Sequence, residues 1–552
     1  MNDVICLPVF GRLLATAARS LTIASLAALL NIGSLGVGPI AHAQVAVLTY
    51  HYDNARTGWN SHETTLTPTN VASSSFTARM VVQLDDQVDA QPLVVPRLAT
   101  VGGHSTQGHD VVYVATENNT VYAIDSVTGA ILVQRHLGAP VSMPSNCNQN
   151  GPNVGIMSTP VIVPGTPGTM YLVTYTVEAG ADVYRIHALN ITTLADVVPS
   201  RVVTGSHQLT NGSLFTFNPA SQRQRPGLLA VDGNIYAGFG SHCDFNGATS
   251  RGWILGWQQN TLKPLAANVL PDTLSTSPNT FFLSSVWMSG YGLAADSNGY
   301  IYAATGNSDP SGTTYSTTNN LANSVIKLKP DLSTIVSFFT PYWEPALDQG
   351  DVDLGAGGVM VIPPQAGPIP NLLAAGGKDG TMFLLNGQSL GGFKAGGPNN
   401  DVAQVNIGQC WCGPTYFSQP GGGVIVAGGS ASITVWNIQS TNSSTSLVEA
   451  GASAPLEPVP ANQDPGHFTT VSSNGPGPGV IIWTVTKPLG ATNTVYLVAL
   501  SQTVNSLGQL TQLTRQPAGD WPTPGIANLV PVVANGRVYV ASYKFLAIFG
   551  VH

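Results

Sequence analysis

The sequence predicts a single all-β domain, a β-propeller of about eight four-stranded blades. Composition is the first observation behind this prediction: of 552 residues only 9% are charged, whereas Gly occurs 60 times and Pro 39 times. Such a composition suits short strands joined by tight turns, because long amphipathic helices need many more charged residues on their outer faces. The second observation is a strand pattern that recurs along the chain with a period of roughly 50 to 70 residues.

Each copy of the repeat starts with a small or polar residue and Pro or Gly, followed by a short apolar strand, a turn and two further strands. The clearest copy has its strands at 90–95, 112–116 and 120–125. Further copies start at Ser158, Arg225, Gly290, Gly355, Cys412, Phe468 and Leu529. One blade cannot bury both of its faces without neighbours, so the blades are expected to close into a ring. We expect N- and C-terminal strands to close it, with the strand near 45–50 lying against the last blade.

The N-terminus has the order of a secretory signal. Arg12 and Arg19 precede an uncharged apolar stretch at 21–37, and Ala41-His42-Ala43 follows it. Cleavage after Ala43 would leave residues 44–552 as the propeller domain; an uncleaved membrane anchor is the alternative. No later segment is apolar and long enough to cross a bilayer. We therefore expect an exported protein, periplasmic or extracellular.

Four cysteines remain after residue 43, and all four are disulfide candidates: Cys147, Cys243, Cys410 and Cys412. The last two either close on each other or pair outward. Metal binding is disfavoured, because Cys-x-Cys without a second close pair lacks the ligand spacing of a zinc site. The net charge of −8, with no run of Lys or Arg, excludes nucleic acid as an expected partner.

One turn, 123–129, resembles the Ala-x-Asp-x-x-Thr-Gly turn of quinoprotein propellers. The segments 50–58, 304–307 and 376–380 also resemble parts of pyrroloquinoline-quinone-binding-like repeat proteins, and the likeness extends over nearly all of residues 44–552. The resemblance implies the fold. It leaves the chemistry open, because this superfamily holds dehydrogenases, assembly factors and members without assigned activity.

The resemblance also implies a place for a cofactor. Enzymes of this type hold calcium beside the quinone with a Glu, an Asn and an Asp. Asn307 matches the Asn ligand, but Asn319 stands where the Asp is expected, and Gly247 lies where the Glu is expected. An amide cannot act as a general base. The resemblance thus implies a degraded quinone site, with Asn307, Asn319 and Lys378 as its cofactor-binding candidates and Asn307 as the metal ligand.

Three residues are candidates for other chemistry at strand ends. His242 and Asp244 follow a strand, where a base with its orienting carboxylate or a metal ligand pair would fit. We favour a structural role for them, with Cys243 in a disulfide, because no third ligand or nucleophile is visible nearby. Glu117 is either a catalytic carboxyl or part of a polar loop. Lys378 also fits an ordinary Lys-Asp-Gly turn.

Three functions remain open. We expect first a binding or scaffold module, rather than an enzyme, whose loop face takes a protein or a glycan. The second is a quinone- and calcium-dependent alcohol or sugar dehydrogenase with altered ligands. The third is a propeller-type lyase or hydrolase using His242 or axial carboxylates.

Overall fold

The computed structural model describes residues 44–552 except 145–146, 148–150, 244–249, 279–281, 309–314, 457, 462 and 489–491. Residues Ala43–His552 form one compact unit. The described residues are almost entirely strands and turns, with the α-helices α1 (Pro68–Val71) and α2 (Glu344–Gly350). Neither described helix is long enough to cross a bilayer. The predicted signal, 1–43, lies outside the described residues.

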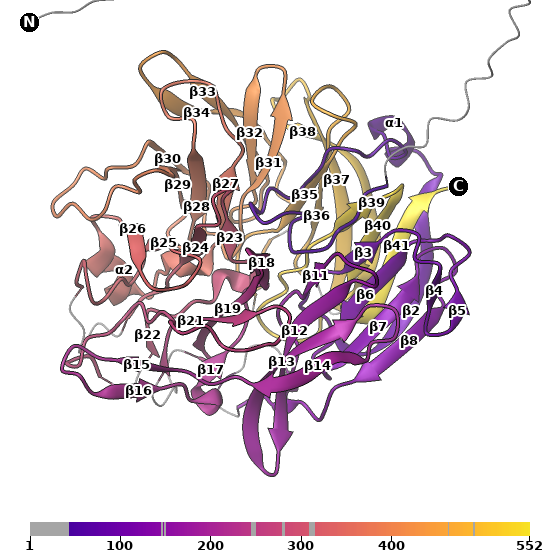
Figure 1. The fold of residues 1–552 in the computed structure, drawn as a ribbon. Helices are drawn as coiled ribbons and strands as arrows, with labels where there is room; N and C mark the ends of the chain where they lie inside the picture. The colour runs from indigo at the N-terminus through magenta and orange to yellow at the C-terminus, as the bar shows by residue number, and fades with distance from the viewer. Residues whose placement is uncertain are drawn as a thin grey trace, which may run out of the picture. The chain divides into compact units, whose positions relative to one another are not determined.

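Eight antiparallel sheets follow one another along the chain and form the blades, as predicted (Figure 1). From the inner strand outward, blade 1 consists of β3 (Leu93–Val95), β6 (Val111–Ala115), β7 (Thr120–Asp125) and β8 (Ile131–His136), and blade 2 consists of β11 (Val161–Val163), β12 (Thr169–Glu178), β13 (Ala181–Asn190) and β14 (Asp196–Val202). Blade 3 consists of β18 (Leu229–Val231), β19 (Asn234–Ser241) and β21 (Trp253–Gln258). Blade 4 consists of β23 (Ala294–Ala295), β24 (Ile301–Ala304), β25 (Val325–Leu328) and β26 (Ile335–Phe339).

Blade 5 consists of β27 (Val359–Ile362), β28 (Leu372–Gly376), β29 (Thr381–Asn386) and β30 (Ala403–Asn406), and blade 6 consists of β31 (Thr415–Gln419), β32 (Gly422–Ala427), β33 (Thr434–Ser440) and β34 (Thr445–Ala452). Blade 7 consists of β35 (Thr469–Ser472), β36 (Ile481–Val485), β37 (Thr494–Val504) and β38 (Leu510–Asp520). Blade 8 consists of β39 (Val532–Ala534), β40 (Arg537–Ala541), β41 (Tyr543–Val551) and β2 (Phe76–Gln87). Short strands lie outside this pattern: β1 (Trp59–Asn60), β4 (Thr100–Val101), β5 (His104–Ser105), β9 (Val141–Ser142), β10 (Asn153–Val154), β15 (Ser206–Gln208), β16 (Leu214–Thr216), β17 (Gln222–Arg223), β20 (Ser250–Arg251) and β22 (Phe282–Leu283).

Blade 3 is the irregular one. Its fourth position holds no continuous strand, and isolated bridges join Ile254 to Val269 and Trp257 to Pro264 instead. The short strand β17 pairs with the end of β19 and carries Arg223. This irregularity brings an arginine to the end of the blade where the inner strand starts.

The ring closes through β2 and β41, which pair from Phe76 opposite Val551 to Gln87 opposite Tyr543. In Figure 1 the indigo β2 lies beside the yellow β41. Apolar side chains of blades 8 and 1, among them Val112, Ile124 and Ile548, then form one core cluster. Closure by N- and C-terminal strands is confirmed, but our choice of 45–50 as the closing strand is wrong. The twelve residues of β2 span the full length of β41, and residues 45–50 are used elsewhere.

Residues 47–60, which we call the axial segment, contact every blade. Their hydrogen bonds reach the inner region of all eight blades in turn, so the segment must lie on the ring axis. Its bonds are Val47 to Val94, Leu48 O to Ile162 N, Asn54 Nδ2 to Ala230 O, Asn54 O to Ala295 N, Ala55 O to Val361 N, Thr57 O to Tyr416 N, Gly58 O to Val471 N and Tyr52 OH to Val533 O. Because buried backbone groups need partners, these bonds fix both the segment and the inner strands.

Arg56 is the centre of the axial segment. Its side chain is fully buried and donates hydrogen bonds to Leu293 O (2.8 Å), Leu228 O (3.0 Å) and Thr49 Oγ1 (2.7 Å), and also to Tyr50 O and Asp53 O. A Cβ at Gly292 would lie 2.7 Å from Arg56 Nε, so only glycine fits there. The guanidinium thus links blades 3 and 4 to the segment.

Candidate axial binding site

A partly open pocket of about 100 Å³ lies at the end of the ring where the inner strands start. Its described lining combines two indoles, three cations, two carboxylates and small or neutral groups: Trp287, Trp411, Arg223, Arg225, Lys378, Asp353, Asp464, His242, Cys243, Ser289 and Ala356. The residues come from blades 2–3, 4, 5, 6 and 7. A volume of this order holds about one aromatic ring.

Trp287 is held in place by backbone at the pocket. Its indole Nε1 donates to Ser241 O at 3.0 Å, and only 8% of its surface is exposed. Any side chain at Gly240 or Gly306 would collide with the ring. Gly240 lies near the end of β19 and Gly306 follows β24, so the ends of these two strands form a slot for the indole. The slot presents a rigid aromatic surface to the pocket.

Arg223 and Arg225 enter the pocket from β17 and from the turn before β18. Both are buried, with 1% and 7% of their surface exposed. Burial lowers the pKa of Arg223, and the carboxylates of Glu117 and Asp89 oppose that shift. An arginine side chain keeps its charge at neutral pH in proteins. The pocket therefore holds buried positive charge.

His242 lies at the pocket, whereas Asp244 is outside the described residues. Burial, and secondly the charge of Arg223, lower the pKa of His242 to about 3. Its Nε2 lies 3.3 Å from Tyr175 OH, and its Nδ1 has no hydrogen-bond partner in the described part of the chain. The imidazole is thus neutral at neutral pH.

Asn307 meets two carboxylates that the sequence did not single out as its neighbours. Asn307 N donates to Asp353 Oδ1 at 2.6 Å, and Nδ2 donates to Asp351 Oδ1 at 3.1 Å. Lys378 Nζ lies 2.5 Å from Asp353 Oδ2 and 3.3 Å from Asp351 Oδ1. These residues lie more than 40 positions after Asn307, so no local spacing signals the contact. Asn307 and Lys378 thus contact the same two carboxylates, and their role as cofactor-binding residues stays a prediction.

Asn319 does not join that group. Its side chain contacts Thr318 and Thr273, and it does not line the pocket. The resemblance led us to look for a carboxylate at position 319. The carboxylates beside Asn307 belong instead to Asp351 and Asp353.

Glu117 lies beside the pocket without lining it. It is 1% exposed, and its Oε2 accepts a hydrogen bond from Gly155 N at 2.7 Å. Burial, and then the neighbouring carboxylate of Asp89, raise the pKa of Glu117 well above its ordinary value. The role of Glu117 as a catalytic residue stays a prediction.

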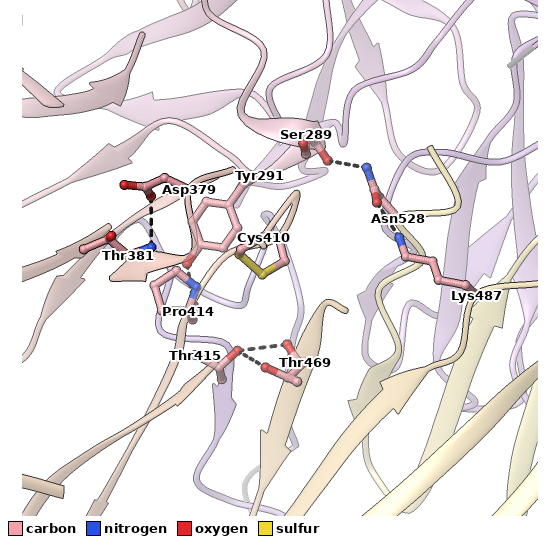
Figure 2. Close-up of a disulfide and its surroundings, with 11 residues drawn as sticks. Ser289, Tyr291, Asp379, Thr381, Cys410, Pro414, Thr415, Thr469, Lys487 and Asn528 are labelled. Atoms are coloured by element: carbon pink, nitrogen blue, oxygen red, sulfur yellow. Dashed lines mark hydrogen bonds between the residues drawn. A yellow bond between two sulfur atoms is a disulfide. The ribbon is translucent and has the colours of Figure 1, made fainter. Parts of the chain in front are cut away.

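The cysteines form two disulfides, Cys147–Cys243 and Cys410–Cys412. The second closes on itself, which settles the alternative that the sequence left open. Figure 2 shows it near Tyr291, whose hydroxyl donates to Pro414 O at 2.8 Å. The described residues contain no group of three or more His, Cys, Asp or Glu that could hold a metal.

A second carboxyl pair lies behind Asn307, on helix α2. Asp348 Oδ1 accepts hydrogen bonds from Ser308 N (3.0 Å) and Asn323 Nδ2 (2.8 Å). Burial, and then the Asp348 carboxylate, raise the pKa of Glu344 to about 9 from an ordinary value of 4.5. The folded chain thus keeps a proton that the unfolded chain releases.

We expect Glu344→Gln to flatten the dependence of stability on pH. The raised pKa means that this carboxyl's contribution is fully present below about pH 4.5 and is lost as pH rises through about 9. The wild-type free energy of unfolding should therefore fall with pH more steeply than that of the variant, by at most about 1.4 kcal/mol per pH unit. Urea unfolding at pH 5, 7 and 9 measures the two slopes, and equal slopes would contradict this assignment.

Comparisons with known proteins bear on the fold. No family model matches the chain, and no curated protein matches it. Among solved structures, the quinohemoprotein alcohol dehydrogenase of Comamonas testosteroni is 13% identical, with a TM-score of 0.58 over 92% of this chain and 81% of that one. A europium-containing methanol dehydrogenase is 12% identical, with a TM-score of 0.57 over 92% and 98%. The quinohemoprotein alcohol dehydrogenase ADHIIG of Pseudomonas putida HK5 is 12% identical, with a TM-score of 0.55 over 92% and 80%.

These similarities define the class of fold. The chain has the β-propeller of the quinoproteins, as the resemblance implied. At 12–13% identity the likeness concerns fold alone.

Proposed function

We propose that this chain is a binding protein whose axial pocket takes a small, planar, anionic ligand. The observation that carries the proposal is the lining: two indoles frame a one-ring volume, and three cations face two carboxylates there. Aromatic side chains favour a planar ligand, and buried arginines favour carboxylate or phosphate groups. The neutral His242 adds a hydrogen-bonding nitrogen. The fold and the two disulfides also support export as part of the proposal.

A second candidate is a quinone-dependent oxidoreductase, which the likeness of fold to alcohol dehydrogenases and the meeting of Asn307 with Asp351 and Asp353 favour. A bound pyrroloquinoline quinone would supply a two-electron acceptor. The residues present do not fit the calcium ion that accompanies it, because the Lys378 ammonium already forms ion pairs with both carboxylates and would repel a second cation there. We therefore place this candidate second. A protein or glycan partner at the loop face stays a prediction.

The test is a titration of the purified chain with isophthalate, followed by tryptophan fluorescence, with the uncharged isophthalamide as the comparison ligand. We expect isophthalate to quench the fluorescence of Trp287 and Trp411 and to bind at least tenfold more tightly than the amide. Arg225→Met should raise the dissociation constant by about tenfold or more, because a charge-assisted hydrogen bond is worth about 1.5–3 kcal/mol.

Arg201→Met is the matched control, since Arg201 is exposed and far from the pocket lining. If Arg225→Met unfolds, Trp411→Leu serves as the second variant, because Trp411 is only half-buried. Equal affinities for the acid and the amide would overturn the proposal. Stoichiometric binding of pyrroloquinoline quinone that requires calcium, together with dye reduction by an alcohol, would establish the oxidoreductase instead.

A further inference from the structure

A second pocket, of about 280 Å³, lies between blades 4 and 5. Its walls follow the inner strands: Asp296 comes after β23, Pro363 comes after β27, and Asn371 precedes β28. The axial pocket is instead lined by residues that precede the inner strands or follow the second ones, such as Asp353 and Lys378. The two pockets therefore lie at opposite ends of the blades, and the second is a separate site.

The inside of this second pocket is largely apolar. Ile362, Leu372, Leu373 and Ala295 are buried side chains of strands β23, β27 and β28 or their ends, and Ala55 of the axial segment adds to the wall. Pockets of roughly 300 Å³ and above, apolar with a few convergent polar groups, are typical small-molecule sites. The volume and lining of this one are close to that description.

One cation faces these apolar walls. Lys327, on β25, is 8% exposed, and its Nζ donates to Gly387 O at 2.8 Å. The same ammonium lies 4.4 Å from the Tyr300 ring centre and 3.8 Å from Asp296 Oδ2, a separation too long for a hydrogen bond. An ammonium has three N–H groups. Among the described residues, Lys327 thus has one hydrogen-bond acceptor, Gly387 O, for its three N–H groups.

Asp296 is engaged elsewhere. Its Oδ1 accepts hydrogen bonds from Asn298 N (2.9 Å) and Tyr300 N (3.1 Å), and its Oδ2 accepts one from Tyr302 OH (2.8 Å). These bonds hold the carboxylate on its own turn, where its Oδ2 forms a long ion pair of 3.8 Å with the Lys327 ammonium. A buried donor with unmet hydrogen-bonding capacity is costly unless a ligand or water completes it. A negatively charged acceptor forms the strongest hydrogen bond with an ammonium group.

We propose that this pocket binds an amphipathic monocarboxylate, with the carboxylate on Lys327 and a short aliphatic or aromatic body against Leu372 and Leu373. The charge of Lys327 selects the head group, and the apolar walls select the body. The site is independent of the axial pocket and of the function proposed for it.

Isothermal titration calorimetry with sodium hexanoate tests the proposal, with 1-hexanol and hexylamine as the comparison ligands. We expect hexanoate to bind at one site and the alcohol and amine to bind at least tenfold more weakly. Lys327→Met should weaken hexanoate at least tenfold, because methionine keeps the apolar stem but not the ammonium. Lys329→Met is the matched control: Lys329 is two residues further along the chain, is exposed, and should leave the affinity within twofold.

A third variant guards against misfolding of Lys327→Met. Asn371 is an exposed residue at the rim, so Asn371→Trp should block the pocket and abolish binding while leaving the melting temperature unchanged. Hexanoate affinity that survives both Lys327→Met and Asn371→Trp would overturn the proposal. So would affinity lost in Arg225→Met instead, since that result would place hexanoate in the axial pocket.

Discussion

Replacing Arg56 with methionine should lower the free energy of unfolding by about 3–5 kcal/mol, because four buried carbonyls and one hydroxyl lose their donor together. Two of these carbonyls, on Leu228 and Leu293, belong to blades 3 and 4, and the others belong to the axial segment. The substitution therefore detaches the segment from the blades that it holds. Chemical denaturation followed by circular dichroism measures the change.

Arg201→Met is again the control for Arg56. The Arg201 side chain is exposed and makes one hydrogen bond, to Thr261 O, so its loss should cost at most about 0.5 kcal/mol. A cost for Arg56→Met as small as that of the control would show that the axial segment does not hold the ring together.

The second large effect is expected at the buried ion pair of blade 3. Asp272 accepts hydrogen bonds from Arg251 Nη1 (2.7 Å), Leu274 N (2.8 Å) and Ser277 Oγ (2.9 Å), and the side chains of Asp272 and Arg251 are both fully buried. Burial raises the pKa of Asp272, and the Arg251 charge opposes that shift. Asp272→Leu removes both carboxylate oxygens, which accept these three hydrogen bonds, and should cost about 3–5 kcal/mol.

Asp272→Asn forms a graded comparison. The amide keeps the shape and one acceptor oxygen, so it should cost less than the leucine, by about 1 kcal/mol or more. Both variants are compared with the wild type by urea unfolding at pH 7. If the leucine variant proved as stable as the asparagine variant, the hydrogen bonds of Asp272 would contribute little to blade 3.

The number of blades and their order could be predicted from local patterns. An apolar strand bounded by Gly, Pro or Asp turns carries its own signal, and the starts predicted at Ser158, Gly355 and Leu529 fall three or four residues before the inner strands β11, β27 and β39. The turn at Asp125 shows why: the Asp125 carboxylate accepts hydrogen bonds from Val127 N and Thr128 N, and Gly129 adopts a φ of 71°. Such contacts join neighbours in sequence, so a single chain reveals them.

Part of the axial pocket could be found in the same way. His242 and Lys378 follow the buried second strands of blades 3 and 5, and these strand ends lie at the pocket. Trp287 and Trp411 carried no such signal, because each lies in a connection between blades rather than at the end of a repeat. Their contribution was therefore missed.

What the sequence by itself determined was the all-β fold, its roughly eight repeats and the four cysteines that form two disulfides. Only the tertiary structure decided that β2 closes the ring, that the axial segment joins all blades, and that Asp351 and Asp353 meet Asn307. Those contacts join residues far apart along the chain. Strand alternation and turns report the local backbone, whereas the closure of a ring depends on how all eight blades pack, which no local pattern records.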